Sequence, residues 1–144
     1  MALSRDEFAA LIPHRGAMCL LHEVLRMDDE SITCCAVSHR DPAHPLREQG
    51  VLPAVCGIEY AAQAMAVHGA LKGAHASQAG VLAAVRDVAL SVERLDDIAE
   101  DLILTARKLL DDGGRLLYEF ELRAGARQLL SGRAIVMLNA GSAR

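Results

Sequence analysis

An apolar segment near the middle of this chain contains a single carboxylate. Besides the phenol of Tyr60, the only strongly polar or ionisable side chains in residues 54–71 are Glu59, Gln63 and His68. A carboxyl group buried in such a segment loses hydration, which favours its protonated form and raises its pKa. A raised pKa suits a general acid that works near neutral pH. Glu59 is therefore a candidate proton donor.

Gln63 follows Glu59 by four residues, which places it on the same helix face at a distance of about 6 Å. Its amide can orient the carboxyl group or line the same cavity. A second interpretation fits the composition equally well, in which Glu59 faces solvent on a partly exposed helix. The local sequence does not separate the two.

His44 is the histidine best placed to act with Glu59. It lies in residues 40–50, where two prolines, scattered charges and a lack of hydrophobic periodicity predict a loop just ahead of the helix. A loop on a rigid element can present a side chain to a cleft. For the other histidines we favour a surface or hydrogen-bonding role: His14, His22, His39, His68 and His75.

The four cysteines lack the paired C-x-x-C spacing of a zinc site, so we expect no metal and free thiols in a reducing compartment. Cys56 stands in the first turn of the helix, where a thiol can become nucleophilic, but without an obvious base beside it a small core residue is the better interpretation. The N-terminus has neither a basic start nor a long apolar run, and we expect a cytoplasmic protein without a membrane span.

Composition indicates one domain over residues 1–144, because a chain of this length with 52% hydrophobic residues builds one core. A net charge of −4, two Phe, two Tyr and no Trp argue against a nucleic-acid partner. Residues 105–144 hold 7 Lys and Arg against 4 Asp and Glu, whereas residues 1–104 hold 8 against 15. The last strands therefore carry a candidate basic patch.

The elements that must position these residues follow from periodicity. Ser4 and Glu7 have the S-x-x-E spacing of a capping box, which predicts a short N-terminal helix that stops before Pro13. Leu116 to Leu122 alternate apolar and polar residues as a strand with one wet face does. One buried helix and a meander of strands predict an α+β fold with the helix on one sheet face. The predicted strands cover residues 19–25, 32–37, 81–92, 102–110, 116–123 and 128–138.

Two segments resemble the β-hydroxyacyl-acyl-carrier-protein dehydratases. Residues 12–25, Ile-Pro-His-Arg-Gly-Ala-Met-Cys-Leu-Leu-His-Glu-Val-Leu, are similar without a gap to that family's opening, LPHRYPFLLVDRVL. Residues 50–64 resemble its helix, PVMPGVLIIEALAQA, with Pro53, Glu59 and Gln63 in matching places. More narrowly, the pattern LPAxxGIEYxAQ is similar to the dehydratase-like proteins of aryl-polyene gene clusters.

The resemblance implies a hot-dog fold, in which an antiparallel sheet wraps around one long buried helix. It also implies dehydration of a β-hydroxyacyl thioester on acyl carrier protein to the trans-2-enoyl thioester, in fatty-acid or aryl-polyene-type biosynthesis. The substrate arrives on a phosphopantetheine arm, and no metal or soluble cofactor is required. Each site of the family draws one residue from each protomer, so a homodimer, a higher oligomer of dimers or a complex with a hetero-partner is expected.

The resemblance also implies roles for individual residues. His44 would take the proton at C2, and Glu59 would give a proton to the departing 3-hydroxyl group. The N–H groups of Ala54 and Val55 would steady the enolate oxygen, with Gln63 in support. The residues that would border the acyl tunnel are Ile58, Ala62 and Met65, together with Val55.

Some positions depart from the family pattern. His44 is followed by Pro45-Leu46-Arg47 instead of Phe-Pro-Gly, and Ala54 replaces a glycine. Two alternatives therefore stay open: a hot-dog thioesterase in which Glu59 activates water, and a non-catalytic acyl-binding or partner subunit. The candidate contacts for an acidic carrier protein are Arg107, Lys108, Arg123, Arg127 and Arg133.

Overall fold

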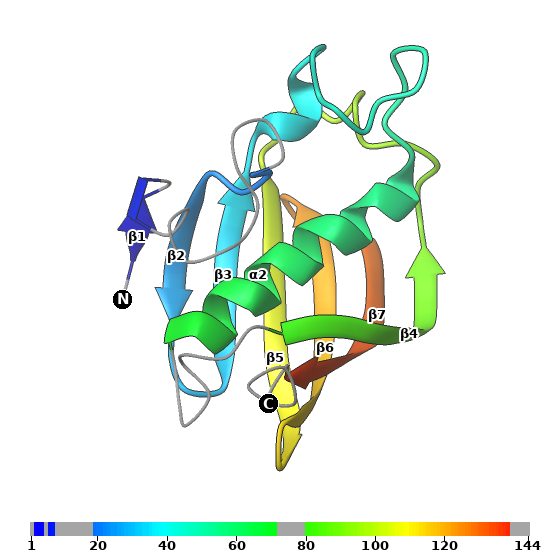
Figure 1. Cartoon of the computed structure of the whole chain (residues 1–144). Coiled ribbons are helices and arrows are strands. Elements are labelled where there is room, and N and C mark those ends of the chain that lie inside the picture. Colours follow the sequence, from blue (N-terminus) through cyan, green and yellow to red (C-terminus); the bar gives the residue numbers. More distant parts are fainter. Residues whose placement is uncertain (1, 5, 8–18, 72–79, 139–144) are drawn as a thin grey trace.

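The structure is a computed structural model that describes residues 2–4, 6–7, 19–71 and 80–138. Its central helix begins with a 3-10 turn, η3 (Ala54–Cys56), and continues as α2 (Gly57–Leu71) (Figure 1). Pro53 precedes this turn in an extended conformation, with ψ of 146°, so it caps the helix and is not its first helical residue. Within the described residues, no helix has the length and apolar character needed to cross a membrane.

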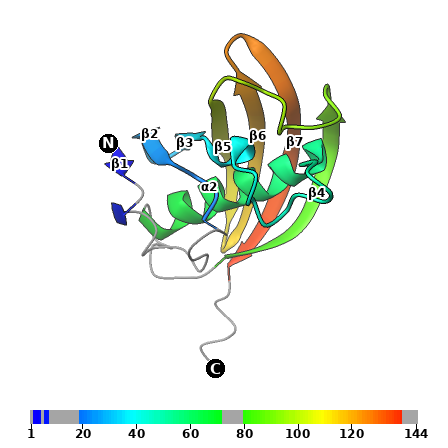
Figure 2. The same cartoon turned by 90° about the horizontal axis from the view of Figure 1, so that it is seen from above.

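A seven-stranded antiparallel sheet curves around α2, as the view from above shows (Figure 2). The order across the sheet is β1-β2-β3-β5-β6-β7-β4. This arrangement confirms the predicted α+β hot-dog fold. In chain order the strands are β1 (Leu3–Ser4), β2 (Glu23–Met27), β3 (Ser31–Ala36), β4 (Gly80–Leu90), β5 (Leu102–Asp112), β6 (Arg115–Ala124) and β7 (Arg127–Leu138).

The core lies between α2 and the concave face of the sheet. Along β6, the alternation predicted from sequence is confirmed, since every second side chain from Leu116 to Leu122 is at most 3% exposed and those between are half-exposed. Gly57 brings the start of α2 close to the sheet. A Cβ atom there would lie 2.8 Å from a methyl group of Leu122 and would also meet Leu130, so a larger residue would displace these two side chains.

Two loops meet at the end of the molecule where α2 begins (Figure 1). Residues 41–53 and 91–101 are joined by hydrogen bonds: Leu95 N–H donates to the carbonyl of Leu52 at 2.9 Å, and Leu52 N–H donates to the Asp96 carboxylate at 2.8 Å. His39, in the short 3-10 turn η2 (Ser38–Arg40), is buried, and its Nε2 contacts two carbonyls of the second loop at 3.1 and 2.9 Å. These contacts hold the loop that carries His44 against the rest of the fold.

Of the predicted N-terminal helix the structure describes only Asp6 and Glu7, which are helical, and its capping box is present. Ser4 N–H donates to the Glu7 carboxylate at 2.9 Å, and Glu7 N–H donates to Ser4 Oγ at 3.4 Å. The rest of the predicted helix, residues 8–12, lies outside the described residues. Ser4 itself belongs to the two-residue strand β1, which pairs with β2.

β4 forms one edge of the sheet, because it pairs with β7 on one side and with no described strand on the other. Leu82, Val88 and Leu90 on this strand are 37–49% exposed. A long apolar edge of this kind is a surface on which another strand can pair.

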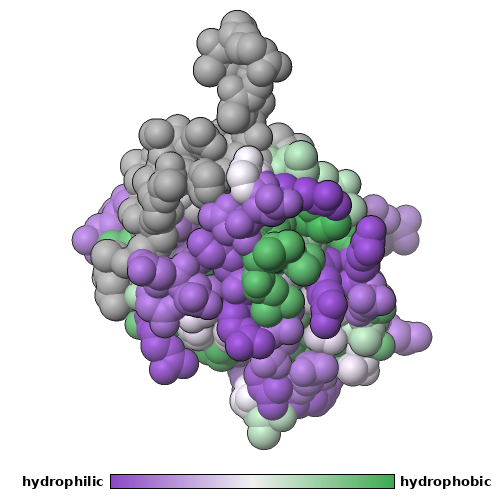
Figure 3. Space-filling model, turned by 90° about the horizontal axis from the view of Figure 1, so that it is seen from below, coloured by the Kyte–Doolittle hydropathy of each residue, from purple (hydrophilic) through white to green (hydrophobic). Residues whose placement is uncertain are grey.

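On the face seen from below, apolar side chains gather among hydrophilic ones (Figure 3). The large exposed apolar residues near the C-terminal ends of β5 and β7 are Leu109, Leu110 and Met137.

Candidate functional site

One narrow face of α2 is open. Its half-exposed residues recur every three or four positions, whereas the residues on its other sides are buried. Glu59 is the only ionisable residue on this face, and it is half-exposed, so its burial lies between the two interpretations made from the sequence. We name this face the open stripe; with one residue of η3 it consists of Val55, Ile58, Glu59, Ala62, Ala66 and Gly69.

The open stripe divides the predicted tunnel residues. Ile58 and Ala62 lie on it, but Met65 is 3% exposed and belongs to the core. Gln63 is fully buried, and its Oε1 accepts a hydrogen bond from Leu20 N–H at 2.9 Å. Gln63 therefore fastens the segment before β2 to the helix.

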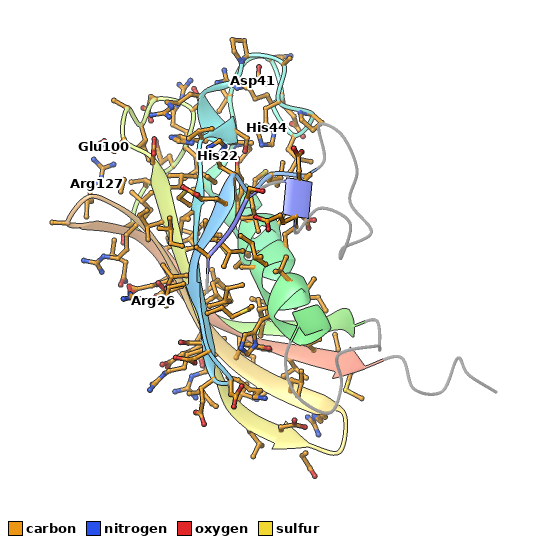
Figure 4. All side chains as sticks on the ribbon, turned by 90° about the vertical axis from the view of Figure 1, so that its left-hand side faces the viewer. His22, Arg26, Asp41, His44, Glu100 and Arg127 are labelled. Atoms are coloured by element: carbon orange, nitrogen blue, oxygen red, sulfur yellow. The ribbon has the colours of Figure 1, made fainter. Side chains whose placement is uncertain are left out.

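His44 is buried, with 5% exposure, at the loop end of the molecule. Figure 4 shows it near Asp41 and far from Arg26, which lies farther down the sheet. Its Nδ1 accepts a hydrogen bond from Leu46 N–H at 3.0 Å, and its Nε2 lies 3.0 Å from Tyr60 Oη. Because a backbone N–H can only donate, Nδ1 carries no proton, and the neutral ring carries its proton on Nε2.

A short series of hydrogen bonds continues from His44 into the fold. Nε2–H donates to Tyr60 Oη, which lies 2.7 Å from Ser38 Oγ, and the Ser38 hydroxyl donates to the carbonyl of Leu20 at 2.8 Å. The protons of the three side chains fit this one direction, since the series ends on a group that can only accept. We name the set His44, Leu46, Tyr60, Ser38 and Leu20 the His44 network.

Electrostatics keep this network neutral. Burial lowers the pKa of His44 below its ordinary value of 6.5; the charges of Arg47 and His39 lower it further, and Asp41 opposes them. Burial also raises the pKa of Tyr60 to about 12. At pH 7 the imidazole and the phenol are therefore uncharged.

The start of the helix offers fewer free donors than the resemblance implied. Ala54 N–H donates to the carbonyl of Glu93 at 3.0 Å, so this group already has a partner. The Val55 side chain is 52% exposed beside Glu59 on the open stripe. Of the two predicted oxyanion donors, Val55 is the one that stays a candidate.

The cysteines give no sign of metal or nucleophilic chemistry. All four thiols are free. Burial, followed by the charges of Glu48 and Glu59, raises the pKa of Cys56, which disfavours the reactive thiolate. Among the described residues, no group of three or more His, Cys, Asp or Glu side chains could hold a metal ion.

The predicted basic patch is smaller in the structure than in the sequence. Arg127 and Arg133 are exposed on β7. The other three basic residues pair with neighbouring carboxylates, which compensates their charge: Arg107 with Glu119, Lys108 with Asp111 and Arg123 with Glu121.

Sequence reasoning missed the partners of His44. Tyr60 carries one of the few polar groups in the apolar helix, and this was a usable signal that it needs a hydrogen-bond partner. Ser38 gave no such signal, because it lies 22 positions from Tyr60 and the two meet only in the folded chain.

Comparison with known proteins agrees with the dehydratase resemblance found in the sequence. The sequence profile of the ApeP-like family, described as ApeP dehydratase, matches residues 7–142. A search of curated proteins finds no match.

Among solved structures, the chain is similar to one from the dehydratase heterocomplex ApeI:P of Xenorhabdus doucetiae, with 25% identity, 94% of this chain and 92% of that chain covered, and a TM-score of 0.79. It is also similar to S. sahachiroi AziG, with 13% identity, 89% and 97% covered and a TM-score of 0.67. A thioesterase family protein from Silicibacter pomeroyi has 13% identity, 80% and 82% covered and a TM-score of 0.61. The last two similarities show the fold alone.

Proposed function

Because this chain belongs to the ApeP-like dehydratase family, we propose that it is a subunit of an acyl-thioester dehydratase. Its substrate is a β-hydroxyacyl thioester on the phosphopantetheine arm of an acyl carrier protein, and its products are the trans-2-enoyl thioester and water. The similarity to a chain of the ApeI:P heterocomplex supports aryl-polyene-type biosynthesis. The four free thiols support a reducing, cytoplasmic compartment.

The observation that carries this proposal is the position of Glu59 as the only ionisable residue of the open stripe. In the reaction, the C2–H bond breaks and a base takes the proton. The C3–O bond breaks as Glu59 gives its proton to the leaving hydroxyl group, so that water departs and a C2–C3 double bond forms. A group that donates this proton contributes about 10²–10⁴ to the rate.

The partner of Glu59 in this chemistry is a histidine of a second chain, since the family draws the two groups of each site from different protomers. The N–H of Val55 is the candidate that steadies the enolate oxygen, as donors aimed at developing charge do. Ile58 and Ala62, on the same stripe, border the acyl chain.

The second chain pairs along β4. The support for this is the open edge of that strand, with Leu82, Val88 and Leu90 exposed on it. The ApeI:P structure is a heterocomplex, which supports a related but different hot-dog chain as the partner. Sedimentation of the chain alone and with such a partner tests this pairing. A monomer at micromolar concentration in both samples contradicts it.

A second candidate function is a non-catalytic subunit that supports the active partner. The hydrogen bonds at both ring nitrogens of His44 favour it, because they leave that imidazole without an open position for a substrate proton.

Mass spectrometry of a carrier-protein thioester separates these functions. A β-hydroxyacyl carrier protein is mixed with this chain, with the partner chain and with both. Loss of water in the complete mixture supports the dehydratase. Loss of the thioester indicates a thioesterase, and binding of the carrier protein without conversion indicates the non-catalytic subunit.

A further inference from the structure

The hydrogen bonds around His44 make the two active sites of a two-chain assembly different from each other. We propose that Leu46, Tyr60 and Ser38 hold His44 as its Nε2–H tautomer, so that of His44 and Glu59 only Glu59 transfers a proton in the reaction. This inference rests on the proposed function. It means that the site built with this chain's Glu59 turns over, whereas the site built with its His44 does not.

A histidine that acts as a base must point an unprotonated ring nitrogen at the substrate. In this chain the lone pair of Nδ1 already accepts Leu46 N–H at 3.0 Å. The loop backbone fixes that contact, because His44 N–H donates to the carbonyl of Asp41 at 3.0 Å and Arg47 N–H donates to the carbonyl of His44 at 3.1 Å. The turn therefore holds the imidazole and its donor together.

The other ring nitrogen faces the protein and not an open cleft. Nε2 lies 3.0 Å from Tyr60 Oη, and the two rings are stacked with centroids 6.0 Å apart and an interplanar angle of 30°. Only 5% of His44 is exposed. A substrate carbon would have to displace the Tyr60 phenol to reach this nitrogen.

Exchange of the tautomer would break two hydrogen bonds. A proton on Nδ1 would face Leu46 N–H, which places two donors against each other. Nε2 would then need a donor, and the Tyr60 hydroxyl could serve only by turning away from Ser38 Oγ. Buried groups that lose partners in this way disfavour the exchanged form.

The charged groups around the ring do not favour the imidazolium either. Burial and the charges of Arg47 and His39 lower the pKa of His44, and Asp41 is the neighbour that opposes them. Tyr60, the titratable group packed against the ring from α2, is a neutral phenol at pH 7, and burial raises its pKa further, to about 12. A neutral ring with both nitrogens bonded is the form that all these contacts select.

Nuclear magnetic resonance tests the tautomer directly. The full chain, labelled with ¹⁵N at histidine and bound to its partner chain, is examined by long-range ¹H–¹⁵N correlation, and His44 is assigned by the signals lost in His44→Gln. We expect an unprotonated Nδ1 and a protonated Nε2 at pH 7. In Tyr60→Phe the Nε2 signal is expected to shift, because it loses its acceptor. A proton on Nδ1, or an imidazolium, overturns the proposal whatever the enzyme activity.

Turnover provides the second readout. Gln at position 44 can still donate to Tyr60 Oη but cannot take up a substrate proton, so His44→Gln separates a positioning role from a base. We expect the complex with His44→Gln to dehydrate the carrier-protein thioester at the wild-type rate. Loss of turnover in a folded His44→Gln complex overturns the proposal. If this variant does not fold, the spectra of wild type and Tyr60→Phe still decide the tautomer.

The two proposals fail in different ways. A wild-type complex that binds the thioester without removing water contradicts the dehydratase function, while the resonances of His44 still decide its tautomer. A wild-type complex that is active and carries a proton on Nδ1 of His44 leaves the dehydratase function standing and overturns the inference about His44.

Discussion

A buried histidine is hydrogen-bonded to a tyrosine at each end of α2, but the histidine is the donor at one end and the acceptor at the other. Near the end of the helix, His68 Nε2 lies 2.8 Å from the carbonyl of Asp28, so it is the protonated nitrogen, and Nδ1 accepts from the Tyr118 hydroxyl at 2.7 Å. At the start of the helix the histidine is the donor, because His44 Nε2–H donates to Tyr60. Both rings are thus the Nε2–H tautomer.

The difference lies in what surrounds each pair. His68 joins α2 to Tyr118 on β6 and to the turn between β2 and β3, so both of its partners lie on the sheet side of the helix. Tyr60 lies beside Glu59, the only ionisable residue of the open stripe. A buried histidine therefore does not identify a catalytic site in this molecule; the open carboxyl group distinguishes one end of the helix from the other.

The largest expected effect is a loss of turnover from a change at the start of the helix. Glu59→Gln keeps the shape of the side chain but removes its transferable proton, so we expect turnover of the two-chain complex to fall by about two to four powers of ten. We expect the melting temperature to stay similar or rise slightly. Steady-state rates and thermal unfolding measure the two quantities. Glu48→Gln, the same change at an exposed loop position, is the control.

Full activity of Glu59→Gln would contradict the assignment of the acid. The non-catalytic partner subunit would then become the better account of this chain.

At the other end of the helix the expected effect is on stability. His68→Leu leaves the Tyr118 hydroxyl and the Asp28 carbonyl without this partner inside the fold. We expect the free energy of unfolding to fall by about 2–4 kcal/mol, because each buried polar group that loses its partner is costly. Urea titration measures the loss. Tyr118→Phe removes one of the two bonds and should cost less, and the double variant tests the coupling. Equal stability of His68→Leu and wild type would show that these bonds do not stabilise the fold.

Much of this architecture could be predicted from the sequence because it depends on local patterns. The alternation along β6 and the apolar run of α2 place these elements within a few residues, and the only carboxylate of that run singles out Glu59. The exact start of the helix could not be predicted in this way. Pro53 is compatible with either the cap or the first turn, and its contact with the loop at Arg94 places it at the cap.

The hydrogen bonds that decide the site are long-range, and the sequence contains no pattern for them. The Ala54 N–H donates to the carbonyl of Glu93, 39 positions away, and the Tyr60 hydroxyl contacts Ser38, 22 positions away. The role of His44 depends on the direction of two hydrogen bonds and not on its residue type. Family resemblance transfers the residue type, but it does not transfer that direction.

Two glycines, one near each end of α2, differ in how closely the fold packs around them. A Cβ atom at Gly57 would meet Leu122 and Leu130, whereas one at Gly69 would meet nothing within 4 Å. We expect Gly57→Ala to destabilise the fold by about 1–3 kcal/mol, since it overpacks a close contact. Gly69→Ala should instead stabilise it by about 0.5–1 kcal/mol, because alanine favours a helix. Urea midpoints compare the two, and a stabilising Gly57→Ala would show that the sheet yields at this point.

The smallest expected effect is the pH dependence of stability at the start of the helix. Burial lowers the pKa of both His44 and His39 below the ordinary value of 6.5. Below pH 6.5 the unfolded chain therefore binds protons that the folded chain does not, and stability falls as the pH falls. Above pH 6.5 this contribution is fully present. Asp96, whose pKa is lowered to about 2, stays charged throughout the range from pH 8 to 5 and does not obscure the effect.

Urea midpoints at pH 8 and pH 5 measure this dependence in wild type and in two variants. We expect the midpoint of wild type to be lower at pH 5, and the decrease to be smaller in His44→Gln, which has no group to protonate at that position. His22→Gln changes an exposed histidine and should show the wild-type decrease. A midpoint that rises toward pH 5 in wild type, and does so less in His44→Gln, would mean that His44 is protonated in the folded chain. That result would contradict the neutral Nε2–H tautomer proposed for His44.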